Sequence, residues 1–99
     1  MNMNNLMAQA QKMQKDIQKK QDELNNMTFV GESEWVNITL KGDKSIIKVE
    51  IKNKTDMDSE DLECMEDMIK IAFDDAINKI NKEIDKKMGM YGKLAGGLF

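Results

Sequence analysis

The chain has 99 residues, the size of one ordinary domain, which excludes a two-domain enzyme with a cleft between its lobes. Apolar residues make up 40% and charged residues 33%, a balance typical of a soluble folded domain, and ten Met beside few aromatic residues predict an aliphatic core. Histidine is absent and there is one cysteine, which removes the commonest general base, the commonest metal ligand and any intrachain disulfide. We therefore expect neither an enzyme nor a metal or cofactor site.

The chain also lacks the marks of a membrane or secreted protein. No apolar run approaches the ~20 residues that a membrane helix needs. The opening residues 1–5 have neither the basic nor the apolar region of a signal peptide. We expect a cytoplasmic protein that does not contact a membrane.

The formal net charge of −3 hides a segregation of charge along the chain. Residues 1–57 carry +1, residues 58–75 carry −7 and residues 76–99 carry +3. Every basic side chain is Lys, and Lys lacks the planar guanidinium that reads guanine edges with two parallel hydrogen bonds. Sequence-specific reading of DNA is therefore disfavoured, whereas contacts to phosphate are not.

The first window, residues 2–26, is predicted to be a long helix. Its apolar residues recur in alternating steps of three and four, which is the pattern of a heptad seam. Such a helix would be about 37 Å long, more than a domain of this size needs to cover its core, so part of it should project. The seam residues are Met3, Leu6, Ala10, Met13, Ile17, Leu24 and Met27.

The middle of the chain changes to a period of two, which predicts two antiparallel strands joined by a turn at Lys41–Lys44. A short strand at residues 28–30 is expected before them, ended by Gly31. One face of the sheet would be aliphatic and the other polar apart from Trp35 and Ile46, so one side needs a cover. The aliphatic positions are Val36, Ile38, Leu40, Ile47, Val49 and Ile51.

A second long helix should begin after a cap at Asp58 or Ser59 and end at Gly89. It carries two apolar strips on opposite sides. The longer strip comprises Leu62, Met65, Ile69, Ala72, Phe73, Ala76, Ile77, Ile80 and Ile84; the shorter comprises Cys64, Met68 and Ile71. One chain offers one sheet to cover, so we expect the shorter strip to lie in a homodimer interface. We expect a single domain over residues 1–88 and a flexible tail over residues 89–99.

Both long helices carry a stripe of lysines about 150° from their apolar seam. Two interpretations are open: a surface that follows the phosphate backbone of DNA, or a solvated helix face with ion pairs along the helix. The repetition on both helices favours the first. The candidate DNA-binding residues are Lys12, Lys15, Lys19, Lys79, Lys82, Lys86 and, less centrally, Lys87 and Lys93.

Other constellations carry little functional signal. The acidic residues between 58 and 75 match no calcium-loop spacing and should instead repel DNA. Cys64 has no basic neighbour at helical spacing to activate it, and Trp35 lacks the aromatic or basic companions of a base-stacking platform. The glycines of the tail do not have the spacing of a phosphate loop.

The run Asn5–Gln14, with sequence NLMAQAQKMQ, closely resembles the opening of the YbaB/EbfC family of bacterial nucleoid-associated proteins. Gly31-Glu32-Ser33, the strand end at Val49 and Ile51, and the run Ala72–Ala76 continue the resemblance in order, with Asp74 where the family has Asn. The sequence departs from the family at Glu34-Trp35, at Lys52-Asn53 and in a tail without prolines. The resemblance implies an α+β fold of order α-β-β-β-α, a tweezers-like homodimer, and binding of duplex DNA that alters its conformation.

Two hypotheses follow, from different functional classes. The first is a homodimeric, non-enzymatic protein of the nucleoid that binds duplex DNA with little sequence preference and takes no small-molecule substrate. The second is a protein-interaction module or chaperone-like adaptor, which would use the amphipathic, Met-rich helices to bind apolar segments.

Overall fold

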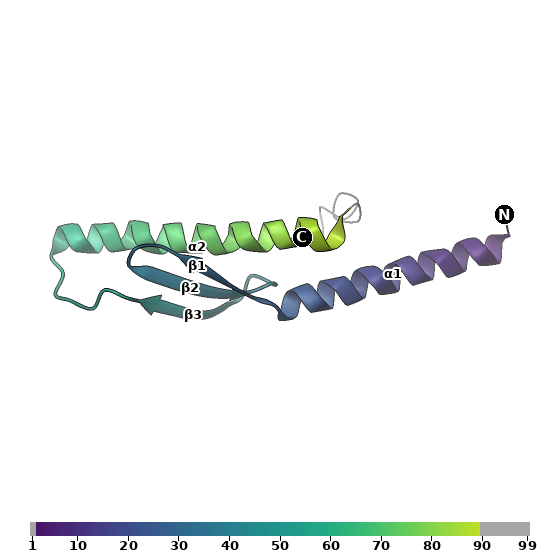
Figure 1. Cartoon of the computed structure of the whole chain (residues 1–99), viewed down its shortest axis with the longest axis horizontal. Helices are drawn as coiled ribbons and strands as arrows, with labels where there is room; N and C mark the ends of the chain where they lie inside the picture. Colours follow the sequence, from purple (N-terminus) through teal and green to yellow (C-terminus); the bar gives the residue numbers. More distant parts are fainter. Residues whose placement is uncertain (1, 90–99) are drawn as a thin grey trace.

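The structure is a computed structural model that describes residues 2–89. One long helix lies along a sheet of three strands, and another extends away from one end of the sheet (Figure 1). The elements, in chain order, are α1 (Met3–Asn26), β1 (Thr28–Glu32), β2 (Val36–Lys41), β3 (Ile46–Ile51) and α2 (Ser59–Met88). The predicted α+β class and the order α-β-β-β-α are confirmed. The predicted tail, from residue 90 onwards, lies outside the described residues.

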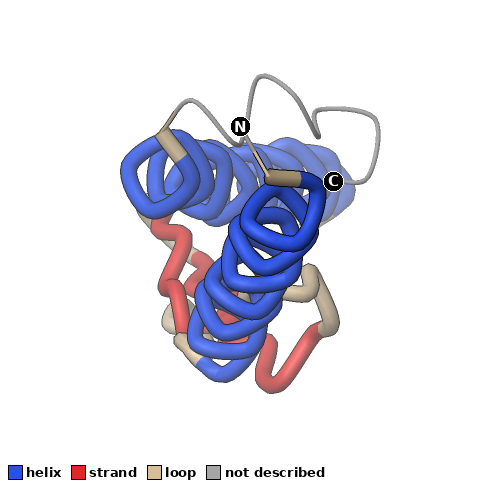
Figure 2. Tube along the Cα trace, turned by 90° about the vertical axis from the view of Figure 1, so that its right-hand side faces the viewer, coloured by secondary structure: helices blue, strands red, loops and turns tan. Residues whose placement is uncertain are grey.

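Helix α1 projects from the rest of the chain, as its length predicts. It is capped by Asn2, whose side chain accepts a hydrogen bond from the backbone N–H of Asn4 at 2.9 Å and so satisfies one free donor of the first turn. Leu24, near the other end of the helix, is its one buried residue. Figure 2, which views the molecule from the end where α1 projects, shows that the axes of the two helices diverge.

The sheet is antiparallel, with β2 between β1 and β3. Val36, Ile38 and Leu40 are buried on the face that α2 covers, as their alternation predicts. A register shift next to Leu40 places Ile46 opposite it. Because residues paired across strands share a face, the predicted position of Ile46 on the polar face is wrong.

Gly31 does not end the first strand, contrary to the prediction; β1 continues through it to Glu32. The glycine is needed because β1 packs directly against the backbone of α2. A Cβ at residue 31 would lie 1.9 Å from the carbonyl oxygen of Ala72 and 2.7 Å from the Cβ of Ala76. The small residues on both sides therefore set the distance between strand and helix.

Helix α2 begins at a reciprocal cap. Asp58 accepts a hydrogen bond from the N–H of Asp61 at 2.9 Å, and the Asp61 carboxylate accepts one from the N–H of Asp58 at 3.2 Å. Two residues of its predicted apolar strip, Leu62 and Ile69, are exposed rather than buried, because α2 lies over β1 and β2 and leaves the β3 side open. The core comprises Leu24, Val36, Ile38, Leu40, Met65, Ala72, Ala76, Ile80, Ile84 and Met88.

Candidate nucleic-acid interface

The lysine stripe on α1 is fully presented to solvent. Lys12, Lys15 and Lys19 are exposed on the projecting helix. Within residues 2–89 no hydrogen bond or ion pair engages their ammonium groups, whereas Lys20, on another side of α1, pairs with Asp16 at 3.4 Å. The three lysines are therefore available for an external anion without the loss of an internal contact.

The lysines of α2 divide into two groups. Lys82 and Lys86 are exposed, and within the described residues neither ammonium group makes a hydrogen bond or an ion pair, although the charge of Lys82 helps to lower the pKa of Asp75. Lys79, in contrast, donates to the carbonyl oxygen of Val30 at 2.6 Å and pairs with Asp75 at 3.2 Å. The structure thus gives Lys79 a role inside the protomer that the stripe pattern did not reveal.

Lys87 also has an internal partner. Its Nζ lies 3.4 Å from a carboxylate oxygen of Glu23, so the ion pair joins the last turn of α2 to the last turns of α1. Lys93, the remaining candidate, lies outside the described residues. Of the eight candidate lysines, five lie on the two helices with no hydrogen bond or ion pair within residues 2–89: Lys12, Lys15, Lys19, Lys82 and Lys86.

Asp75 is a structural residue that sequence reasoning missed. Its Oδ2 accepts a hydrogen bond from the N–H of Glu32 at 2.9 Å and pairs with Lys79. The Glu32 N–H, followed by the Lys79 ammonium, holds the pKa of the Asp75 carboxyl below its ordinary value. The short motifs around Gly31 and Asp75 meet here, through a hydrogen bond between Glu32 and Asp75, which are 43 positions apart, and together they fasten the outer edge of β1 to α2.

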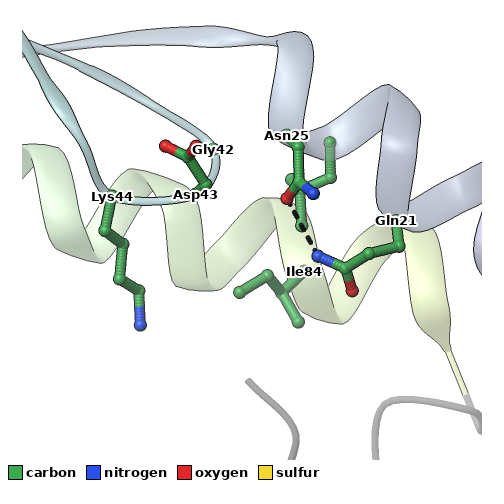
Figure 3. Close-up of a pocket in the computed structure, with 7 residues that line it drawn as sticks. Gln21, Asn25, Gly42, Asp43, Lys44 and Ile84 are labelled. Carbon is green, nitrogen blue, oxygen red and sulfur yellow. Dashed lines mark hydrogen bonds between the residues drawn. The ribbon is translucent and has the colours of Figure 1, made fainter.

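A second junction fixes the direction in which α1 leaves the sheet. Gly42, in the turn between β2 and β3, donates its N–H to the carbonyl oxygen of Met27 at 3.0 Å. A Cβ at residue 42 would lie 1.8 Å from the carbonyl oxygen of Leu24, so the turn packs directly on the end of α1. A cleft of about 250 Å³ opens beside this contact (Figure 3). It is lined by Gln21, Leu24, Asn25, Gly42, Asp43, Lys44 and Ile84.

The position of the cleft shows how the two helices that carry the candidate lysines are arranged. The cleft lies where the last turns of α1 meet Ile84 of α2, and Figure 1 shows α1 and the C-terminal half of α2 on the side of the molecule away from the first half of α2. The acidic residues of the first half of α2 lie toward the opposite end. Since the chain carries −7 over residues 58–75 and +3 over residues 76–99, an anionic polymer is attracted to the lysine end and repelled by the other.

The residues predicted for a dimer interface are only partly exposed. Met68 packs against the core, Cys64 is half-buried with a free thiol, and Ile71 is 50% exposed. A larger set of exposed aliphatic side chains lies on the other side of α2 and along β3, and all of them except Ile46 were expected from the sequence to be covered. That set comprises Ile46, Ile47, Val49, Ile51, Leu62 and Ile69.

Residues 2–89 offer neither a metal site nor a membrane span. No group of three or more acidic or cysteine side chains there is arranged to hold a metal ion. Neither described helix combines the length and apolarity that crossing a membrane requires.

Comparison with known proteins shows which family this chain resembles. The profile of the YbaB/EbfC DNA-binding family matches residues 1–98. Curated relatives called nucleoid-associated proteins include one from Streptococcus uberis, 42% identical over 95% of this chain and 97% of its own, and one from Lactococcus lactis, 40% identical over 94% and 95%. A protein of the same name from Streptococcus pneumoniae is 43% identical over 95% and 97%.

Proposed function

The chain belongs to the YbaB/EbfC DNA-binding family, and we propose that it is a nucleoid-associated protein that binds duplex DNA as a homodimer, largely without regard to sequence. The observation that carries this proposal is the group of exposed lysines without internal partners on the projecting helix α1. We assign the main contacts to phosphate to these three residues and to the two stripe lysines of α2 that form no ion pair within residues 2–89. They are Lys12, Lys15, Lys19, Lys82 and Lys86.

The chemistry of these side chains accounts for the kind of binding proposed. An ammonium group on a flexible stem forms point-charge contacts with phosphate, and each contact releases a counterion from the DNA. The absence of Arg removes the commonest side chain for base readout in the major groove. Affinity should therefore depend on salt far more than on base sequence.

Lys79, Lys87 and Lys93 take a secondary place in the proposal. Lys79 and Lys87 would have to share their charge with Asp75 and Glu23 or leave those partners to reach phosphate. A lysine that already has an acidic partner gains less from meeting DNA, because the old contact is lost as the new one forms. Lys93 is included among the secondary candidates only because it is a basic residue near the end of the chain.

The homodimer would present two projecting α1 helices to one duplex, in the tweezers-like arrangement that the family resemblance implies. Two copies double the number of phosphate contacts and hold DNA at two separated points, which is how the protein would alter the conformation of DNA and contribute to nucleoid organisation and gene regulation. The proposed location is the nucleoid within the cytoplasm. The proposed function involves no catalysis and no small-molecule substrate.

A second candidate function has its own observation. The seam of α1 stays uncovered over most of its length: Met3 is 74% exposed, and Leu6 and Met13 are 46% exposed each; Met7, beside the seam, is 58% exposed. Flexible, polarisable Met side chains adapt to varied apolar partners, so this seam suits an adaptor or chaperone-like module that binds apolar segments.

A gel-shift titration with unrelated duplexes at low salt separates the two functions. The test variant is Lys12/Lys15→Glu, and the matched control is Lys54/Lys70→Glu, which makes the same change in net charge at exposed lysines away from the stripes. The proposal predicts that the wild type and the control shift every duplex at micromolar protein and that the test variant does not. No shift by the wild type, or equal loss in both variants, would favour the adaptor.

A further inference from the structure

The turn between β2 and β3 holds a lysine in a backbone conformation that usually belongs to glycine. Lys44 has a φ of 72°, and among the described residues other than glycine it alone has a positive φ. Its N–H donates to the carbonyl oxygen of Lys41 at 2.8 Å, and the N–H of Lys41 donates to the carbonyl oxygen of Ser45 at 2.9 Å. Hairpin turns that end on a residue in the left-handed region favour glycine there.

The contacts of Lys44 within the protomer do not explain why this residue is a lysine. In the left-handed region a Cβ crowds the carbonyl oxygen that follows it, and only Gly, Asn and Asp adopt this conformation readily. The Lys44 side chain is exposed, and within residues 2–89 no hydrogen bond or ion pair engages its ammonium group. Backbone strain that the protomer does not repay is typical of positions with a function.

The turn lies where the two lysine-bearing helices come together. A Cβ at Gly42 would meet the backbone of α1, so the turn packs directly on the end of that helix. Lys44 lines the cleft of about 250 Å³ together with Asn25 of α1 and Ile84 of α2 (Figure 3). The axes of the two helices diverge from this region (Figure 2). Lys44 therefore adds a positive charge at the base of the angle between them.

The acidic neighbour of Lys44 in the turn is occupied elsewhere. A carboxylate oxygen of Asp43 accepts hydrogen bonds from the N–H of Ser45 at 2.9 Å and from its hydroxyl. These two bonds, and less strongly the charge of Lys41, hold the pKa of the Asp43 carboxyl below its ordinary value. Figure 3 shows the Asp43 carboxylate and the Lys44 ammonium group on opposite sides of the turn. The Lys44 ammonium group is thus open to an external anion.

We infer that Lys44 contacts a phosphate of DNA that lies between α1 and the C-terminal half of α2. This inference rests on the DNA binding proposed above and adds a third point of contact to the two lysine stripes. The ammonium group extends from a turn that is packed on α1, so its position is fixed relative to the stripe on that helix. DNA that met only the projecting part of α1 would leave Lys44 without a phosphate. The contact therefore reports how deeply the duplex is seated.

The substitution Lys44→Asn separates the cost of the lysine to the fold from its use in binding. Asn tolerates the left-handed region, so the variant should raise the thermal midpoint by about 4 °C at equal protein concentration. The loss of one phosphate contact should lower affinity for every duplex roughly fivefold at 100 mM salt and flatten the slope of log K against log salt by about one unit. A gain in stability together with a loss of affinity cannot come from damage to the fold.

Two control variants isolate the charge at residue 44. Lys54→Asn makes the same change in charge at an exposed lysine away from the cleft, and it should leave affinity unchanged and the midpoint within about 2 °C. Lys44→Arg keeps both the charge and the backbone strain, so it should retain affinity and the wild-type midpoint. Melts and fluorescence-anisotropy titrations of the full chain with unrelated duplexes measure all three variants.

The variant Lys15→Ala separates failure of this inference from failure of the proposed function. Weaker binding by Lys15→Ala, with wild-type affinity and slope in Lys44→Asn, would overturn the contact at Lys44 and leave DNA binding by the stripes standing. A lower midpoint in Lys44→Asn, with affinity lost in Lys44→Arg as well, would show that the residue serves the fold and would also overturn the contact. The absence of DNA binding by the wild type would overturn both proposals.

Discussion

The contact between Gly31 and α2 makes Gly31→Ala the substitution whose cost follows most directly from the structure. The added Cβ would lie 1.9 Å from the carbonyl oxygen of Ala72 and 2.6 Å from the backbone N of Ala76. An ordinary contact needs roughly 3.5 Å, so β1 would have to move away from the helix by more than 1 Å. That movement would stretch the Glu32 to Asp75 and Val30 to Lys79 hydrogen bonds, which are 2.9 and 2.6 Å long.

The expected loss of stability combines these effects. Overpacking of a tight contact costs about 1–3 kcal/mol, and weakening of two exposed hydrogen bonds adds about 1 kcal/mol. A total of about 3 kcal/mol corresponds to a fall in the thermal midpoint of roughly 12–24 °C for a domain of this size. Circular dichroism melts and urea unfolding at equal protein concentration measure it.

Two further variants serve as controls for the effect of Gly31→Ala. Thr28→Ala, at an exposed position of the same strand, should change the free energy of unfolding by less than about 0.5 kcal/mol. Gly31→Ala combined with Ala76→Gly should not recover stability, because the shortest contact is with the backbone of Ala72. Recovery in the double variant, or a midpoint within about 3 °C of the wild type for Gly31→Ala, would refute the account of this packing.

Further outcomes are expected elsewhere in the chain. Asp75→Asn should destabilise the protein at pH 7. Because the pKa of Asp75 is lowered in the folded state, the stability that its carboxylate contributes is present above the unfolded pKa and is lost as pH falls through the folded pKa. Urea unfolding should therefore show that the difference in free energy of unfolding between wild type and variant vanishes well below about pH 4. Removal of residues 90–99 should leave the thermal midpoint within a few degrees and the dimeric mass unchanged, since the core that residues 2–89 form, from Leu24 to Met88, remains in the shortened chain. Gly42→Ala should lower the midpoint as Gly31→Ala does, because its Cβ would meet the Leu24 carbonyl at 1.8 Å, and a melt beside Asp43→Ala measures it.

The local elements of this fold could be predicted from the sequence because each rests on a short-range pattern. The steps of three and four in residues 3–24, the alternation in Val36, Ile38 and Leu40, and the cap at Asp58 depend only on helix and strand geometry. The three-stranded antiparallel order follows because short connections join neighbouring strands.

What could not be predicted depends on contacts between distant segments. Gly31 looked like the end of a strand because its reason for being glycine, the backbone of Ala72, lies in another element. The register shift that moves Ile46 to the apolar face is a property of two strands together. Lys79 has the spacing of a stripe residue, and only the position of β1 beside it reveals its contact with Val30.

The salt dependence of DNA affinity tests the central claim most directly. Five free lysines per protomer give ten in a dimer, and if about half meet phosphate together, log K should fall with log salt at a slope near −4.5, a loss of several hundredfold between 50 and 200 mM. Lys15→Ala should flatten the slope by about one unit and lower affinity equally for every duplex, whereas Lys54→Ala should do neither. A nearly flat response, or a preference for one duplex that survives loss of Lys12, Lys15 and Lys19, would contradict the assignment of the lysine stripes to DNA.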